Sequence, residues 1–94
     1  MERLTKELES NGLFIVDDSQ IQHDANGYSG EAINKLAKFE NFYNDLIFKQ
    51  SEISMELEKL RFEGKTNSVK FKQLLTNKMT NNTILILLKA YGLQ

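Results

Sequence analysis

The sequence offers one histidine as a candidate for acid–base chemistry. His23 lies in a polar stretch, with Ser19 and Asp24 nearby in sequence. A catalytic histidine needs a nucleophile and an orienting group held within hydrogen-bond reach, and closeness in sequence does not supply that geometry. We therefore predict that His23 is a solvated side chain and that the chain is not an enzyme.

Two further patterns resemble ligand-binding motifs but lack essential positions. Asp17, Asp18 and Asp24 suggest a calcium loop, yet the alternating oxygen ligands and the closing glutamate of an EF-hand are missing. Gly64-Lys65-Thr66 matches the end of a phosphate-binding loop, but the position that needs an earlier glycine is Lys59. The chain also has no cysteine, which removes thiolate metal sites and disulfides. The sequence thus predicts no catalytic residue, metal or cofactor.

Charge is unevenly distributed along the chain, although the net charge is only −1. Residues 1–30 contain two basic and six acidic side chains, whereas residues 64–94 contain five lysines and no acid. The candidates for an acidic, partner-binding face are Glu7, Glu9, Asp17, Asp18 and Asp24. The candidates for contact with nucleic-acid phosphates are Lys65, Lys70, Lys72, Lys78 and Lys89. The simpler interpretation, which we favour, is that the two ends neutralise each other within the fold, because the lysines form a thin patch.

The N-terminal part of the chain favours β-structure. Asn11-Gly12 is a strong signal for a type I′ hairpin turn, which needs positive φ at both central residues. The apolar run that follows is β-prone, and together they predict a β-hairpin over residues 3–17. Leu4 and Leu8 are four residues apart and would share a helix face, so a short helix followed by one strand is the alternative. Residues 18–29 are rich in turn-forming residues and are predicted to be a loop.

The clearest feature is a heptad pattern over residues 31–63. Two sets of side chains recur every seven residues and interleave at spacings of three and four, which predicts an amphipathic helix. One set is Leu36, Tyr43, Gln50 and Leu57, and the other is Ala32, Phe39, Leu46, Ile53 and Leu60. Ser29 is the expected cap at the start, and Gly64 the expected left-handed residue at the end. The helix either continues over roughly 45–50 Å or breaks near Gln50.

Two shorter helices are predicted after it, over residues 67–78 and 83–91. Asn67 or Ser68 would cap the first, a polar break would separate the two, and Gly92 would end the second. The last helix is apolar on nearly all sides and is therefore expected to be the buried centre of the domain. The pair resembles a helix-turn-helix only faintly, because its second helix offers few polar residues to DNA. We predict a plain αα-hairpin.

Together these elements predict a mainly α fold with a short N-terminal β-hairpin, of the α+β class. We expect a single domain over residues 1–94, built as a small helical bundle with one long heptad-patterned helix. The opening residues contain no apolar run typical of a signal peptide, and the longest apolar run, residues 84–88, is too short to cross a bilayer. A chain without cysteine suits a reducing compartment, so the expected location is the cytoplasm, with no membrane partner.

Two stretches of the sequence resemble a known group of proteins. The chain opens Met1-Glu2-Arg3-Leu4-Thr5-Lys6 and later reads Ile33-Asn34-Lys35-Leu36-Ala37-Lys38-Phe39-Glu40-Asn41. It resembles short proteins without an assigned activity that phages and prophages of Firmicutes encode, which often open Met-x-Arg-Leu-Thr and carry Lys-Leu-Ala-x-aromatic-Glu-Asp/Asn. The resemblance covers about 15 residues. The chain departs from many of these proteins in its lack of cysteine and its long second half. The resemblance implies a phage accessory protein acting in the host cytoplasm, and it transfers no functional residue.

Three functional hypotheses follow from these observations. The first is a small phage-derived interaction protein that acts by stoichiometric binding, such as an inhibitor of a host defence nuclease comparable to anti-CRISPR proteins, with its acidic residues against a basic groove. The second is a nucleic-acid-binding or regulatory protein that uses the lysine-rich C-terminal third. The third is a self-associating helical scaffold or minor virion component. A homodimer would then form through Leu36, Phe39, Tyr43, Leu46, Ile53, Leu57 and Leu60.

Overall fold

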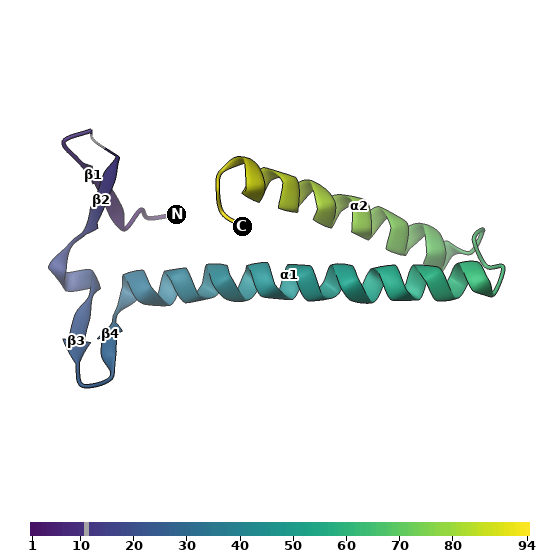
Figure 1. Cartoon of the computed structure of the whole chain (residues 1–94), viewed down its shortest axis with the longest axis horizontal. Helices are drawn as coiled ribbons and strands as arrows, with labels where there is room; N and C mark the ends of the chain where they lie inside the picture. Colours follow the sequence, from purple (N-terminus) through teal and green to yellow (C-terminus); the bar gives the residue numbers. More distant parts are fainter. Residues whose placement is uncertain (11) are drawn as a thin grey trace. The chain divides into compact units, whose positions relative to one another are not determined.

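The computed structural model describes residues 1–10 and 12–94. Two short β-hairpins are followed by two α-helices, α1 (Glu31–Phe62) and α2 (Val69–Ala90) (Figure 1). The predicted α+β class, mostly helical with N-terminal strands and one long helix, is confirmed. Internal contacts divide the chain into two compact units, the N-terminal unit (residues 1–41) and the C-terminal unit (residues 42–94). The single domain over residues 1–94 stays a prediction.

The first hairpin consists of β1 (Thr5–Leu8) and β2 (Leu13–Val16), so the N-terminal segment is a strand and not a helix. The two strands are antiparallel, and Leu8 lies opposite Leu13. Gly12 has a φ of +81°, as the turn prediction requires, whereas Asn11 lies outside the described residues. The register leaves residues 9–12 between the strands, a longer connection than a two-residue turn.

The predicted loop over residues 18–29 is wrong, because this segment contains regular structure. It begins with a short 3₁₀ helix, η1 (Asp18–Gln20), and continues into a second antiparallel hairpin. The strands of this hairpin are β3 (Gln22–Asp24) and β4 (Gly27–Ser29). Strands of three residues are too short to show the alternation by which a strand is recognised in sequence.

The turn-forming residues that suggested a loop build the tight connection of this second hairpin. The Asp24 carboxylate accepts a hydrogen bond from the backbone N–H of Asn26 at 2.8 Å, and Gly27 has a φ of +122°. Across the strands His23 lies opposite Tyr28, with ring centroids 4.5 Å apart. His23 is exposed, as predicted, but it lies in a strand.

Gly30 forms the junction between β4 and α1. Its carbonyl accepts the N–H of Asn34 at 2.9 Å and so opens the helix, whereas Ser29, the predicted cap, is paired in β4. Gly30 has a φ of +125°, and a Cβ at this position would lie only 2.4 Å from the carbonyl oxygen of Gln20. Only glycine satisfies both constraints, so this residue allows η1 to approach the start of α1.

The long helix α1 is continuous over 32 residues, which excludes a break near Gln50. No glycine or proline occurs between residues 31 and 62. Gln50 faces α2, where its side-chain amide donates a hydrogen bond to the Lys78 carbonyl at 3.2 Å. This bond gives the amide N–H of the half-buried side chain a partner, whereas its Oε1 is buried without one.

The second helix, α2, is also continuous, over 22 residues. The prediction of two helices over residues 67–78 and 83–91 is therefore wrong. Residues 80–83 were expected to break the helix because threonine and asparagine favour N-caps. Instead the Thr83 hydroxyl donates a hydrogen bond to the Met79 carbonyl at 3.1 Å, which satisfies the hydroxyl within the helix.

Both helices end in the predicted glycine motif. Gly64 and Gly92 have φ values of +72° and +75°. At each end, the N–H of the glycine and the next N–H bond to carbonyls three and five residues earlier, which is a Schellman arrangement. At the start of α2, the Ser68 hydroxyl accepts the N–H of Phe71 at 3.1 Å, so Ser68 is the cap.

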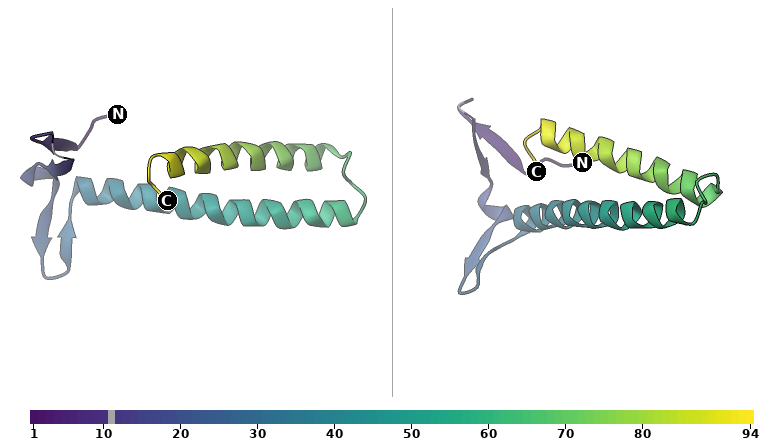
Figure 2. Two further views of the ribbon diagram at one scale, coloured as in Figure 1. Left: turned by 45° about the horizontal axis from the view of Figure 1, so that its top comes forward. Right: turned by 45° about the vertical axis from the view of Figure 1, so that its right-hand side comes forward.

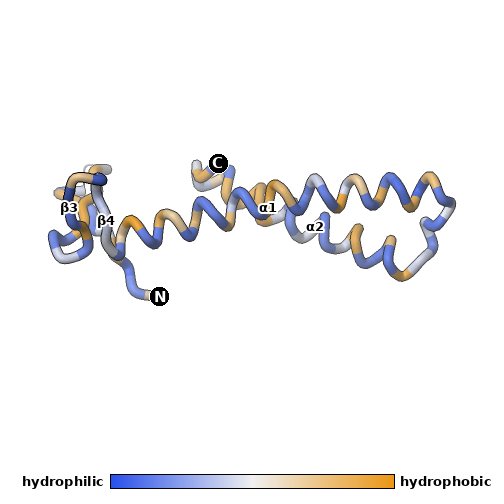
Figure 3. Tube along the Cα trace, turned by 90° about the horizontal axis from the view of Figure 1, so that it is seen from below, coloured by the Kyte–Doolittle hydropathy of each residue, from blue (hydrophilic) through white to orange (hydrophobic). Residues whose placement is uncertain are grey.

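In the C-terminal unit, α1 and α2 lie side by side and antiparallel, as the predicted αα-hairpin (Figure 2). Leu57, Leu60 and Phe71 form a buried cluster, and Ile53 and Leu74 pack against it. Hydrophobic residues recur along the length of both helices (Figure 3). One partner helix can cover only one stripe of such a surface, so many of these side chains stay in solvent.

The expectation that the last predicted helix is the buried centre of the domain is wrong, because α1 covers only one stripe of α2. Phe71 is the only buried side chain of α2, all of whose residues are described. Ile86 and Leu87 are 59% and 56% exposed. Among the described residues, no helix combines the length and hydropathy that crossing a membrane requires.

Replacing Gly30 by alanine should destabilise the N-terminal unit by about 1–3 kcal/mol, because the new Cβ meets the Gln20 carbonyl and φ is positive. Amide hydrogen exchange should show lower protection in β3 and β4. Gly27→Ala is the matched control, since its φ of +122° is nearly the same but no atom lies within 4 Å of its Cβ. Equal losses in the two variants would contradict the role of the close approach.

Replacing Leu57 by alanine should lower the free energy of unfolding by about 2–5 kcal/mol, because Leu57 is fully buried in the cluster between the helices. Guanidinium denaturation followed by circular dichroism measures the change. Met55→Ala, two residues away and 71% exposed, should change it by less than about 0.5 kcal/mol. Similar effects of the two substitutions would argue against this core.

Candidate functional site

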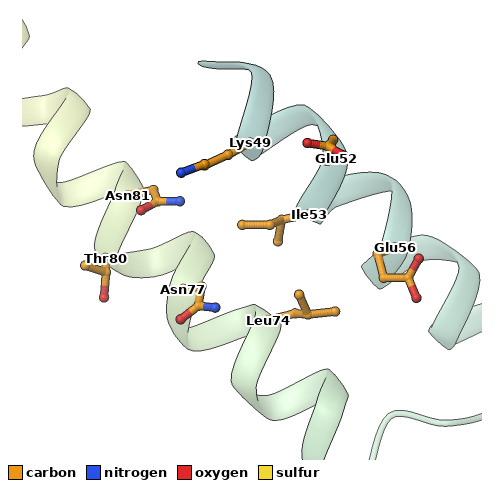
Figure 4. A pocket seen from close by; sticks show the side chains of 8 residues that line it. All are labelled: Lys49, Glu52, Ile53, Glu56, Leu74, Asn77, Thr80 and Asn81. Atoms are coloured by element: carbon orange, nitrogen blue, oxygen red, sulfur yellow. The ribbon is translucent and has the colours of Figure 1, made fainter. Parts of the chain in front are cut away.

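A groove of about 520 Å³ lies between α1 and α2 in the C-terminal unit (Figure 4). Ile53 of α1 and Leu74 of α2 extend into the space between the helices and form its apolar floor. Both side chains belong to the layer that packs on the buried cluster, so the floor is a continuation of the core. The polar lining consists of Lys49, Glu52 and Glu56 on α1, and Asn77, Thr80 and Asn81 on α2.

An ion pair links the two helices beside this groove. The Lys70 ammonium lies 2.9 Å from a carboxylate oxygen of Glu56, whose side chain is two-thirds covered. The hydrogen bond from Lys70, with the charge of the lysine adding to it, holds the pKa of Glu56 below its ordinary value. The ion pair thus links α2 to the α1 side of the groove.

The groove combines an apolar strip with a rim of hydrogen-bonding groups. Side-chain amides on α2 supply both donors and acceptors, and Lys49 adds a cation. A strip of this kind, flanked by polar groups, suits an extended peptide or one face of a helix. Among the described residues, no three His, Cys, Asp or Glu side chains are grouped so that they could hold a metal ion.

The predicted acidic face falls entirely within the N-terminal unit, and all its members are exposed. Glu7 lies in β1 and Glu9 just after it, in the connection between the strands. The aspartates follow at η1 and β3, and they are Asp17, Asp18 and Asp24. The hairpins and η1 thus present all five carboxylates on short elements of one unit.

Two of these carboxylates are held by backbone hydrogen bonds. Asp17 caps η1, because its carboxylate accepts the backbone N–H of Ser19 at 3.0 Å. That bond is the main cause of a lowered pKa of Asp17, and a side-chain hydrogen bond from Ser19 adds to it. Asp24 holds the β3–β4 turn in the same way, through the N–H of Asn26. These charges are therefore fixed in position relative to their own hairpin.

The predicted lysine candidates do not form one surface. The Lys65 ammonium lies 2.9 Å from the Glu63 carboxylate, and Lys70 is paired with Glu56. Lys65 is the main cause of a lowered pKa of Glu63. Two of the five lysines are therefore partly neutralised by acidic residues at the end of α1 or just after it. Neither pair involves an acidic residue of residues 1–30, so neutralisation between the two ends of the chain stays a prediction.

The directions of the remaining lysines also differ. Residues two apart on a helix point about 160° away from each other, so Lys70 and Lys72 lie on nearly opposite sides of α2. Lys72 and Lys78 differ by about 120°, whereas Lys78 and Lys89 lie within about 20°. These five described residues therefore do not form a continuous cationic stripe along which a phosphate backbone could bind.

Three exposed aromatic and thioether side chains of α1 are not among the residues predicted from the sequence. Phe48, Met55 and Phe62 are 65%, 71% and 94% exposed. Their spacing of seven places them on the side of α1 opposite the seam, and this spacing is the signal that reveals them. The helix therefore carries a second, narrower apolar face besides the one that the heptad pattern predicted.

The seam proposed for a homodimer is largely used within the chain. Leu46, Leu57 and Leu60 are buried in the single chain, and α2 covers the latter two. Gln50, another seam residue, is bonded to α2 through the Lys78 carbonyl. A second copy therefore has no access to this face as a whole while the αα-hairpin is intact.

Comparisons of the chain with protein-family models, with curated proteins and with solved structures found no match. The resemblance to phage proteins therefore stays a prediction.

Replacing Lys70 by glutamine should raise the pKa of Glu56 toward its ordinary value, because Lys70 is the main cause of the lowering. Carboxyl NMR titration measures the shift. Since the folded pKa is lowered, the pair stabilises the hairpin above the ordinary pKa, and this contribution is lost as the pH falls through the lowered one. Lys72→Gln is the control, and an unchanged pKa of Glu56 in Lys70→Gln would contradict the assignment.

Proposed function

We propose that this protein is a small non-enzymatic interaction protein that acts by stoichiometric binding to a protein partner. The observation that carries the proposal is the imbalance between its buried and exposed apolar side chains. The buried hydrophobic residues of the described chain are Leu46, Leu57, Leu60 and Phe71. Many more large apolar side chains are exposed, including Phe62 at 94% and Met55 at 71%. Apolar surface on this scale is typical of proteins whose working state is a complex.

More specifically, we propose that the partner is a defence nuclease of the bacterial host in which a phage replicates. The support comes from the resemblance to phage proteins and from the acidic N-terminal unit. A nuclease carries a basic groove for nucleic acid, and carboxylates such as Asp17 and Asp24, fixed by backbone hydrogen bonds, lose little freedom when they bind there. This protein would then occupy the nucleic-acid groove of the nuclease in place of the phosphates.

The two helices give this proposed inhibitor a second means of contact. The groove with Ile53 and Leu74 at its floor offers a partner an apolar strip bordered by amides and charges. Direct binding of nucleic acid has less support, because Lys65 and Lys70 are paired with carboxylates and the other lysines diverge.

A titration of purified host nuclease with the full chain tests the proposal, with calorimetry giving stoichiometry and affinity. Asp17→Asn with Asp18→Asn should weaken binding about tenfold, because two charges are lost while asparagine keeps the cap of η1. The matched control is Glu40→Gln with Glu58→Gln, which removes two charges outside the acidic face and should change the affinity little.

A pull-down of tagged chain from a lysate of a Gram-positive host, with and without nuclease digestion, identifies which nuclease to titrate. A partner that survives digestion is expected. If the lysate yields no protein partner, or if both double variants weaken binding equally, the proposed inhibitor with an acidic binding face is wrong. A captured band that disappears on digestion would favour the nucleic-acid hypothesis instead.

A further inference from the structure

The two open sides of the αα-hairpin differ in chemistry, and the difference follows from position in the heptad. On α1, residues that come directly before a seam residue line the groove side, as Lys49 and Glu56 show. On α2, the inward-facing positions are the buried and half-buried ones, and Asn77, directly before the half-buried Lys78, lines the same side. Successive residues on a helix point about 100° apart, so the residues directly before and directly after a seam residue point to opposite sides of the seam. The residues that come directly after a seam residue therefore line the side opposite the groove. Arg61 marks that side, because it follows Leu60 and its guanidinium lies 5.5 Å from the Phe71 ring centroid.

The central part of this opposite side carries four exposed apolar residues among uncharged polar ones. Ile47 follows the seam residue Leu46 on α1, and three residues that follow inward-facing positions occupy the same side of α2. The apolar side is defined by Ile47, Leu75, Met79 and Ile86, which are 44%, 37%, 64% and 59% exposed. Their neighbours on the same side are small or uncharged polar residues, Asn44, Ser51, Ser54 and Asn82.

No charged side chain follows a seam position between residues 44 and 54 of α1 or between residues 75 and 86 of α2, all of which are described. The charges on this side lie only toward its ends, at Glu58, Arg61 and Lys72 near the connection and at Lys89 near the C-terminus. A two-fold axis sets a surface against itself, so a charged centre would place like charges together. The neutral centre of the apolar side avoids that repulsion, whereas α1 carries Lys49, Glu52 and Glu56 on the groove side.

The size of the apolar side also suits a second copy. Residues 42–62 of α1 extend over about 30 Å, and two helices side by side are about 20 Å wide, which gives a flat footprint of about 600 Å². A stable protein interface buries about 800 Å² of accessible surface on each partner, and accessible area exceeds the flat footprint because side chains interdigitate. The footprint of one side of the αα-hairpin is thus of the same order as the area that a specific dimer buries.

We propose that a second copy of this chain docks on the apolar side, so that two αα-hairpins form a four-helix bundle. In this bundle Ile47 of α1 and Leu75 of α2 lie beside the contact between the two helices of one hairpin. Met79 and Ile86 contact the partner hairpin. The flexible methionine fills gaps between the layers. Two hairpins packed in this way bury the exposed apolar residues of this side, whereas Phe48, Met55 and Phe62 stay in solvent. This surface is distinct from the seam, which α2 occupies, and the proposal does not depend on the acidic face or on a host partner.

Sedimentation equilibrium of the full chain across a wide micromolar range tests the proposal. The wild-type chain should approach twice its mass of 10.9 kDa. Met79→Glu should raise the dimer dissociation constant by at least about tenfold, because a carboxylate would be buried against the partner. Met55→Glu is the matched control, because Met55 is similarly exposed, at 71%, but lies on the far side of α1. Circular dichroism shows whether each variant keeps its helices.

A single-chain mass at every concentration would overturn the proposal, and so would equal weakening by the two glutamate variants. If Met79→Glu loses its helices, a thiol placed at the same position decides the question, because the chain has no cysteine of its own. The thiol of Met79→Cys should react with iodoacetamide more slowly as the chain concentration rises, whereas that of Met55→Cys should not. A reaction rate of Met79→Cys that does not depend on concentration would reject the assigned surface.

Discussion

The contact between Leu57 and Leu60 of α1 and Phe71 of α2 is the constraint on which the C-terminal unit depends. A single amphipathic helix in water gains too little from its backbone to persist, and it needs a partner for its apolar stripe. Once α2 covers the seam, the position of every other side chain follows from the helical repeat. Residues before the seam line the groove, residues after it line the apolar side, and Phe48, Met55 and Phe62 are left on the back of α1.

In the N-terminal unit, close contacts between backbone segments hold the elements together, as buried side chains do between the two helices. Gly30 lets η1 reach the start of α1, and the Lys35 ammonium of α1 donates a hydrogen bond at 2.8 Å to the Glu2 carbonyl, which precedes β1. No described side chain of residues 1–30 is fully buried. A unit built on turns and caps leaves its carboxylates in solvent, where each can contact a partner without disturbing a core.

The sequence pattern predicted those features whose physical cause is local or periodic. The heptad spacing identified α1, and the left-handed glycines identified both helix ends. The continuity of α2 was missed because Thr83 can either cap a helix or bond within it, and packing against α1 decides between these. The second hairpin was missed because its strands are short. The acidic residues were found from composition, but the groove was not, because it exists only when two helices are paired.

The short connection between α1 and α2 has a consequence for the speed at which the chain acquires its structure. Only residues 63–68 separate the two helices, so the contacts that form the hydrophobic cluster are close in sequence. Loops of this length close within about 10–100 ns, and chains dominated by local contacts fold within microseconds to milliseconds. The chain also contains neither proline nor cysteine, so no slow isomerisation or oxidation delays it. Synthesis of the chain, rather than its folding, then sets how soon the protein can act.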